Sequence, residues 1–263
     1  YNNNTNPSIK RRSNMTQLLR AAILATAMCA TAGAAMAQQT TESRPVDAKA
    51  SRINLGGVLM LHVKQGPTAS LTLSGDRRLV SKVVTRQTGD VLTIDLDNSG
   101  FKWNRDEGTV RVNLTVPNLS EFTSRGVGEA TMTGFTGNSI TLVQDGAGAI
   151  SMAGNYRYVK ARLAGVGSMK LNTGSSEEVD LALKGAGEIS ITGKAKLLRA
   201  SLGGVGGLEA KDLVADAVDV NMSGLGGASV YAKNSAKVNL GGMGSATVYG
   251  NPAQRTVSGK RVQ

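Results

Sequence analysis

The chain has 263 residues, of which 33 are glycine and 5 are proline, and aromatic residues make up only 3%. Such a composition is typical of disordered segments or of repetitive β structure, and the regular spacing of the apolar residues favours repetitive β structure. The formal net charge is +11, but no nucleic-acid-binding motif accompanies the scattered basic residues, so we expect no nucleic-acid partner.

The N-terminal segment has the pattern of a secretion signal. Residues 1–14 are polar, and we expect Met15 to be the start of translation. A short basic region and an apolar run over residues 21–32 follow, and an A-x-A site ends at Ala37, so we predict cleavage before Gln38. The apolar run is too short to span a membrane, and no other stretch is long and apolar enough. The sequence therefore predicts an exported protein (periplasmic, on the outer surface or secreted) with no transmembrane segment in the mature chain.

The part that follows is β-like but irregular. Residues 38–49 are polar and predict a linker, and residues 50–118 hold several strand-like runs without a common period. We expect these runs to form either broad β rungs or a small sandwich joined to the next part. The runs cover residues 53–63, 71–73, 91–96 and 110–116.

Residues 119–250 repeat a Gly-x-Gly unit seven times, with successive first glycines 20, 19, 20, 19, 20 and 18 residues apart. So regular a period predicts a solenoid, in which each repeat is one coil stacked on its neighbours. We expect the glycines to form tight corners, where positive φ or close backbone approach excludes a side chain. The pairs begin at Gly126, Gly146, Gly165, Gly185, Gly204, Gly224 and Gly242.

Alternating apolar residues flank each glycine pair and predict one strand on either side of it. The columns two and four residues after the second glycine are apolar, as in Ile150 and Met152, and we expect them to point inward. We also expect the residues in the columns six and four positions before the first glycine to point inward. The first of these columns is Ser120, Ile140, Val159, Val179, Leu198, Val218 and Ala236.

The outward residues of the strand before the glycines alternate in sign. Lys160, Asp180, Arg199, Asp219 and Lys237 occupy the same position in five successive repeats. Stacked strands lie ~4.8 Å apart, so each charge would sit between opposite charges. The sign pattern therefore predicts in-register stacking independently of hydrophobicity.

The repeat pattern stops after Gly250, and we expect residues 251–263 to form a cap. Pro252 cannot donate a ladder hydrogen bond, and Arg255, Lys260 and Arg261 place charge near the open end. Both features oppose edge-to-edge aggregation of strands.

The Gly-x-Gly rungs, the run Leu71-Thr-Leu-Ser-Gly-Asp76 and the closing Tyr249-Gly-Asn-Pro252 together resemble the head GIN domain family of auto-transporter adhesins. The resemblance covers residues 50–263. It implies an all-β, right-handed β-helix, export, and an adhesive or cell-envelope role, and it supplies no catalytic residues.

Candidate chemical sites in the repeat are weak. Glu129 and Glu188 share a phase, but three rungs place them ~14 Å apart at ~4.8 Å a rung, beyond the roughly 5 to 9.5 Å between glycosidase carboxylates. Arg125 and Asp145, one rung apart, are expected to form a surface ion pair. Calcium binding of the roll type is not expected, because the period is about twice that of calcium-binding rolls and their aspartate is missing. Nucleotide binding is not expected either, because the Gly-x-Gly units precede strands, whereas nucleotide-binding loops precede helices.

His62 is the only histidine, and the only cysteine, Cys29, lies inside the secretion signal. The mature chain therefore lacks the residues for a catalytic triad, a multi-histidine metal site or a thiolate site. We expect no catalytic residue, no metal and no cofactor.

Two groups of aromatic residues are the candidates for ligand contact. Phe101, Trp103 and Arg105 lie in a polar segment, where the aromatic rings could stack on sugar or could plug the core. Tyr231 and Tyr249 share a phase and are expected to point outward on adjacent rungs, as a ligand-binding ladder or as ordinary cross-rung packing.

The sequence thus predicts an exported, non-enzymatic β-helical protein with an adhesin or cell-envelope scaffold role and a glycan or cell-surface polymer as partner. The alternatives are a carbohydrate-binding module, a polysaccharide-active enzyme on a β-helix, and a binder of anionic polymers. Binding of the last kind would weaken steeply with salt.

Overall fold

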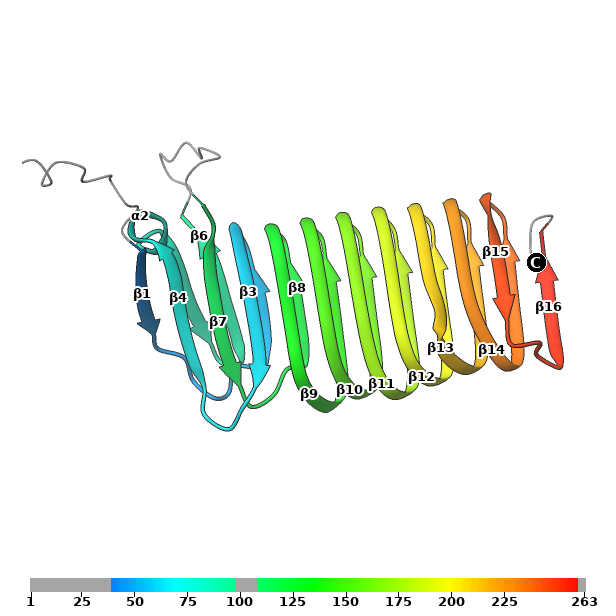
Figure 1. The fold of residues 1–263 in the computed structure, drawn as a ribbon, viewed down its shortest axis with the longest axis horizontal. Coiled ribbons are helices and arrows are strands. Elements are labelled where there is room, and N and C mark those ends of the chain that lie inside the picture. The colour runs from blue at the N-terminus through cyan, green and yellow to red at the C-terminus, as the bar shows by residue number, and fades with distance from the viewer. Residues whose placement is uncertain (1–38, 98–107, 260–263) are drawn as a thin grey trace, which may run out of the picture. The chain divides into compact units, whose positions relative to one another are not determined.

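The computed structural model describes residues 39–97 and 108–259, and most of them belong to β-strands. Figure 1 shows these strands stacked side by side as successive coils of one solenoid. The expected fold class, an all-β solenoid, is confirmed. The signal segment, with Ala37 and Gln38, lies outside the described residues.

Six long strands form the regular part, and each runs from one Gly-x-Gly pair to the next. They are β9 (Val127–Gln144), β10 (Ala147–Leu163), β11 (Val166–Leu183), β12 (Ala186–Leu202), β13 (Val205–Met222) and β14 (Leu225–Leu240). Neighbours pair in parallel, and a register shift interrupts each pairing from β9 to β14 near its middle. Each coil therefore has a glycine corner at its Gly-x-Gly pair and a second, bulge corner at the register shift, seen as turns at opposite ends of each coil in Figure 1.

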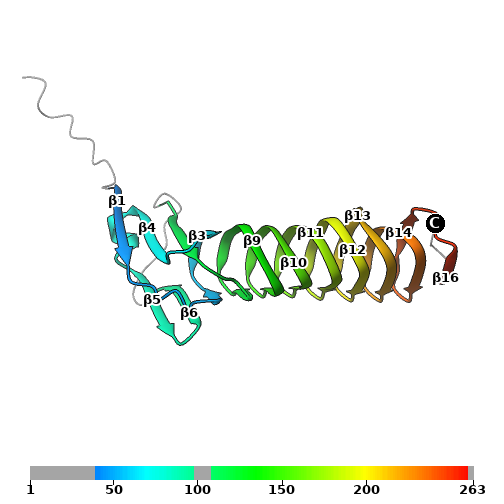
Figure 2. The ribbon, with the colours of Figure 1, turned by 90° about the horizontal axis from the view of Figure 1, so that it is seen from below.

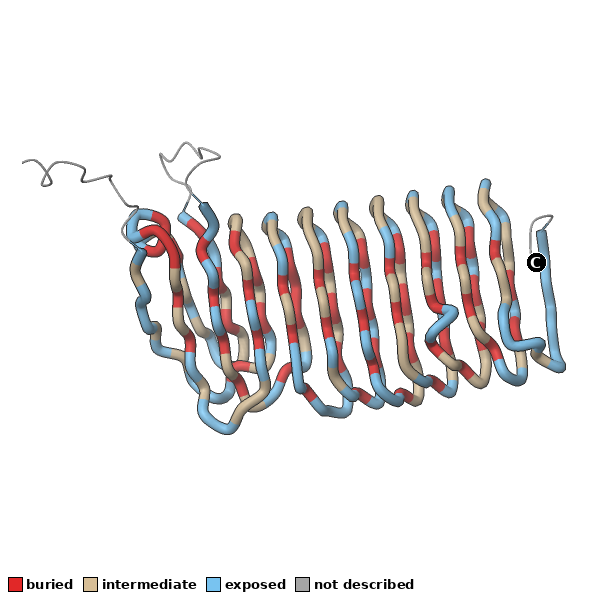
Figure 3. The backbone as a smooth tube through the Cα atoms, in the orientation of Figure 1, coloured by how far each residue is buried: buried red, intermediate tan, exposed pale blue. Residues whose placement is uncertain are grey.

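The predicted inward columns form the core on both sides of the glycine corners. Ile150 and Met152 after the corner are each 1% exposed, and Leu142 before it is fully buried. Figure 3 shows buried residues recurring between more exposed ones along the coils of β9 to β14. Ser120 is an exception to the predicted column: it is exposed, and its hydroxyl donates to the carbonyl oxygen of Ser51 at 3.1 Å, while Leu119 beside it is buried.

The column of alternating charge stacks in register, as predicted. Lys160, Asp180, Arg199, Asp219 and Lys237 are successive register partners. Lys160 Nζ lies 4.0 Å from Asp180 Oδ2, whereas the Arg199 guanidinium pairs with Glu178 instead of either aspartate. Exposed pairs of this kind contribute only tenths of a kcal/mol each, so their main effect is to disfavour shifted registers.

The glycine corners are sterically closed to any side chain. Gly187 has φ +150°, and a Cβ on it would overlap the carbonyl oxygen of Gly167 on the preceding coil. The first glycine of each pair is equally close to the coil before it, since a Cβ on Gly185 would overlap the carbonyl oxygen of Gly165. The backbones can therefore stack at normal strand spacing only because both positions lack a side chain.

The N-terminal region forms true rungs, but out of chain order. β2 (Arg52–Leu55) and β3 (Val58–Gln65) pair in parallel with β8 (Glu121–Ser124) and β9. On their other side they pair in parallel with β6 (Val91–Leu96) and β7 (Val110–Val116). The coil of residues 52–65 therefore lies between two coils that follow it in the sequence.

Antiparallel strands close this end of the solenoid. β4 (Ser70–Asp76) pairs with β7, β5 (Val83–Thr88) pairs with β6, and the one-turn helix α2 (Arg77–Val80) joins β4 to β5. β1 (Gln39–Arg44) pairs antiparallel with β4, and Figure 2 shows it at the end of the row. Residues 39–44, within the stretch 38–49 that we expected to be a polar linker, thus form a cap strand, because their backbone completes the hydrogen bonds of β4.

The other end carries one more coil. β15 (Met243–Tyr249) and β16 (Gln254–Ser258) both pair in parallel with β14. The ladder therefore continues into the expected cap, residues 251–263, because Pro252 lies in the turn between the two strands. All five residues of β16 are exposed.

Candidate binding groove

The structure separates the candidates that the sequence suggested. Phe101, Trp103 and Arg105 lie outside the described residues. Tyr231 and Tyr249 are direct register partners on β14 and β15, and Tyr249 is 44% exposed. The pairing places them on adjacent coils, and their contact with a ligand stays a prediction.

The carboxylates that share a phase do not meet. Register partners lead from Glu129 through Ala149 and Ser168 to Glu188, so three coil steps separate the two glutamates. Arg125 and Asp145 are both exposed, and the described part of the chain contains no ion pair between them, contrary to our expectation. Neither residue lies within a strand, so the ladder does not hold their side chains together.

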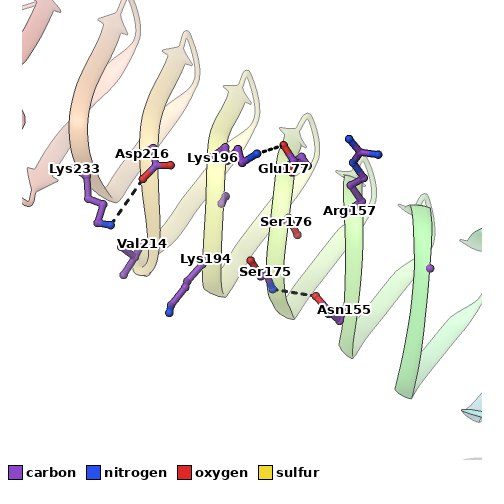
Figure 4. Close-up of a pocket in the computed structure, with 12 residues that line it drawn as sticks. Asn155, Arg157, Ser175, Ser176, Glu177, Lys194, Lys196, Val214, Asp216 and Lys233 are labelled. Carbon is purple, nitrogen blue, oxygen red and sulfur yellow. Dashed lines mark hydrogen bonds and ion pairs between the residues drawn. The ribbon is translucent and has the colours of Figure 1, made fainter.

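The polar and charged residues of the bulge corners gather in one groove. Its volume is about 510 Å³, and it crosses the coils from β9 to β14. Figure 4 shows its lining in close-up. The lining residues are Gly137, Asn155, Arg157, Ser175, Ser176, Glu177, Lys194, Ala195, Lys196, Val214, Asp216 and Lys233.

One side of the groove is a row of alternating charge on four successive coils, Arg157, Glu177, Lys196 and Asp216, which we call the charged row. Lys196 Nζ lies 2.7 Å from Glu177 Oε2, and its hydrogen bond holds the pKa of that carboxyl below its ordinary value. Asp216 Oδ1 lies 3.9 Å from Lys233 Nζ. The carboxylates are thus largely compensated within the groove.

A second row runs beside the first and reaches further along the solenoid. Its members are linked by strand register and, between Asn155 and Ser175, by a 3.1 Å hydrogen bond from the Ser175 amide to the Asn155 side chain. None of its members is buried. We call it the axial row, and it consists of Thr136, Asn155, Ser175, Lys194, Val214, Tyr231 and Tyr249.

Lys194 is the exposed cation of the axial row. Figure 4 shows its side chain extending away from the Lys196–Glu177 and Lys233–Asp216 pairs. Within the described part of the chain it forms no ion pair. The four lining cations outnumber the two lining carboxylates, so the groove carries a net charge of +2. Its chemistry suits an extended ligand with hydrogen-bonding groups and some negative charge.

The groove was not predicted from the sequence, although one signal for it was present. Arg157, Glu177, Lys196 and Asp216 each stand eight residues before the first glycine of the next pair, and their signs alternate. The same reasoning that we applied to the column of alternating charge three positions nearer the corners could have found them. Among the described residues, no group of histidine, cysteine and acidic side chains is arranged to hold a metal ion.

Stacked parallel coils, closed glycine corners, an antiparallel cap and rows of outward side chains define a β-solenoid that displays a continuous surface along its length. The chain belongs to the family described as "Putative auto-transporter adhesin, head GIN domain", which matches residues 51–252. The family suggested by the sequence motifs is thereby confirmed, and the chain is an adhesin-like β-solenoid.

Solved structures from Bacteroides and Parabacteroides species share the fold. A putative adhesin from Bacteroides fragilis is 22% identical, with a TM-score of 0.65 over 86% of this chain and 94% of that one. A putative adhesin from Parabacteroides distasonis is 19% identical, with a TM-score of 0.70 over 86% and 96%. A protein of the same species described as a putative lipid binding protein is 18% identical, with a TM-score of 0.64 over 85% and 96%. At these identities the likeness shows the fold alone.

No curated protein matches the chain. Among the described residues, no helix is long and apolar enough to cross a membrane.

Proposed function

We propose that the protein is exported and acts without catalysis, as an adhesion or cell-envelope scaffold protein that binds a glycan or another cell-surface polymer. The observation that carries this proposal is the groove across the bulge corners, whose outward side chains are fixed on a stack of hydrogen-bonded coils. A surface that offers one outward position on each successive coil suits a ligand that is extended along the solenoid.

Membership of an adhesin family supports the same function, and the secretion signal predicted over residues 15–37 supports the export. The separation of Glu129 from Glu188 by three coils argues against a glycosidase built on that pair. The proposal therefore assigns binding, and not turnover, to the solenoid.

The test is to present the purified full chain to an array of bacterial envelope and host-surface polysaccharides, with release of reducing ends measured in parallel. We expect retention of at least one polymer without any release. Depolymerisation of a bound polymer would overturn the non-enzymatic assignment, and binding to no polymer would overturn the adhesive one. Mass spectrometry of the exported protein should find Gln38 at its N-terminus, and an exported form that retains residues 15–37 would contradict the predicted processing.

A further inference from the structure

The axial row has a direction that restricts what can bind to it. Its seven members lie on seven successive coils, so the row runs across the strands and along the solenoid. Six steps of ~4.8 Å give a track about 29 Å long. A ligand that follows it must be an extended chain, since a compact molecule would contact only two or three members.

The chemistry changes along the track. At the groove, Asn155, Ser175 and Lys194 offer an amide, a hydroxyl and an ammonium group on consecutive coils. At the far end, Tyr231 and Tyr249 lie side by side on β14 and β15. Tyr231 lies against the turn that follows β15, since a Cβ on Gly250 would come within 3.0 Å of its ring. Tyrosine combines an apolar ring face with a hydroxyl, which suits the apolar faces and hydroxyl groups of sugars.

The charges of the groove favour a ligand with spaced negative groups. Lys194 is free to pair with an acidic group, whereas Lys233, two coils further on, already lies 3.9 Å from Asp216. Glu177 and Asp216 already engage Lys196 and Lys233, so few cations of the groove are left for a ligand, which disfavours a chain of high charge density such as a nucleic acid. Anionic groups spaced along an uncharged backbone meet both conditions.

We propose that the axial row binds an acidic polysaccharide, whose carboxylate or sulfate groups pair with Lys194 while its sugar rings stack on Tyr231 and Tyr249. This assignment rests on the proposed function, since it names the ligand class of the same surface. The polymer lies along the solenoid axis and crosses from the groove on β10–β12 to the two tyrosines.

The experiment uses the full chain and two matched pairs of polymers in titration calorimetry. Polygalacturonate is compared with its methyl ester, and dextran sulfate with dextran. We expect binding of at least one acidic polymer, at least tenfold tighter than its neutral counterpart. The pair that shows the difference identifies carboxylate or sulfate as the recognised group.

Two variants and two matched controls locate the site. Lys194→Gln should weaken binding roughly threefold to tenfold, as expected for the loss of one typical hydrogen bond. Lys184→Gln removes the same charge at the opposite, glycine corner and should leave the affinity nearly unchanged. Tyr249→Ser should weaken binding, whereas Tyr158→Ser, at a 39% exposed tyrosine outside the row, should not.

Circular dichroism spectra that match the parent would show that each variant is folded. Equal losses for Lys194→Gln and Lys184→Gln would overturn the proposal, because they would indicate diffuse attraction to a basic protein. Tight binding of only neutral polymers would overturn the proposal but leave the adhesive function intact. Binding to none of the four polymers would also count against it, and the array described above then decides the adhesive function separately.

Discussion

Replacing one corner glycine provides the sharpest test of how the coils stack. Gly206 has φ +134°, and a Cβ on it would overlap the carbonyl oxygen of Gly187 and come within 2.8 Å of its carbonyl carbon. Both atoms belong to the backbone, so neither can move aside without shifting a coil. The next residue, Gly207, is a matched control, because its φ is not positive and the nearest atom to a Cβ would be 3.4 Å away.

Two terms set the size of the effect of Gly206→Ala. An alanine held at this φ is strained by about 1 to 3 kcal/mol, and forcing a methyl group into a closed contact costs about 1 to 3 kcal/mol more. We therefore expect Gly206→Ala to lower the free energy of unfolding by about 2 to 6 kcal/mol. Gly207→Ala should change it by no more than about 1 kcal/mol, and in the stabilising direction if the backbone entropy of the unfolded chain dominates.

Urea unfolding of the full chain, followed by circular dichroism, measures both variants. If the unfolding free energies of the parent and the variant depend on urea concentration with the same slope, a shift of the midpoint reports a change in stability. Indistinguishable midpoints for Gly206→Ala and Gly207→Ala would refute the steric account of the glycine corners, because only the first variant places a methyl group against the preceding coil.

Two further predictions concern single side chains. Gln144 is 1% exposed, and its side-chain amide has no hydrogen-bond partner among the described residues, while its register partner Leu163 is apolar. Because Gln144→Leu removes a buried, unpaired polar group, it should raise the free energy of unfolding by about 1 to 3 kcal/mol. An unchanged or lower urea midpoint would contradict this. Lys196 lowers the pKa of Glu177, so the pair contributes stability above the ordinary carboxyl range and loses it as the pH falls through the lowered pKa. Glu177→Gln should therefore lower the melting temperature at pH 7, and this difference should shrink as the pH falls through the lowered pKa of the parent carboxyl. A difference that grows on acidification would exclude this linkage.

Local patterns made the regular part of the fold predictable. Alternation of apolar residues marked both strands of each coil, and the sign sequence from Lys160 to Lys237 gave the register that the structure contains. These features are readable because each coil repeats the same environment at nearly the same spacing. The rungs of residues 52–65 and 91–116 were not recognisable in this way, because their partners are distant in sequence and the chain visits them out of order.

The axial row shows where sequence counting fails. Counted from the second glycine of each repeat, Ser175 stands eighth, Lys194 seventh and Tyr231 fifth, so no fixed phase joins them. The bulge corners absorb these differences, since their register shifts allow segments of unequal length to span the same turn.

The sequence by itself determined the period, the two strands of each coil, the glycine corners and the family, because each depends on residues close together in the chain. Only the tertiary structure decided the order of the N-terminal coils, the antiparallel cap and the row that brings Lys194 into line with Tyr231 and Tyr249. These depend on backbone pairing between coils, and hydrogen bonds between backbones are insensitive to side-chain identity and so leave little trace in the sequence.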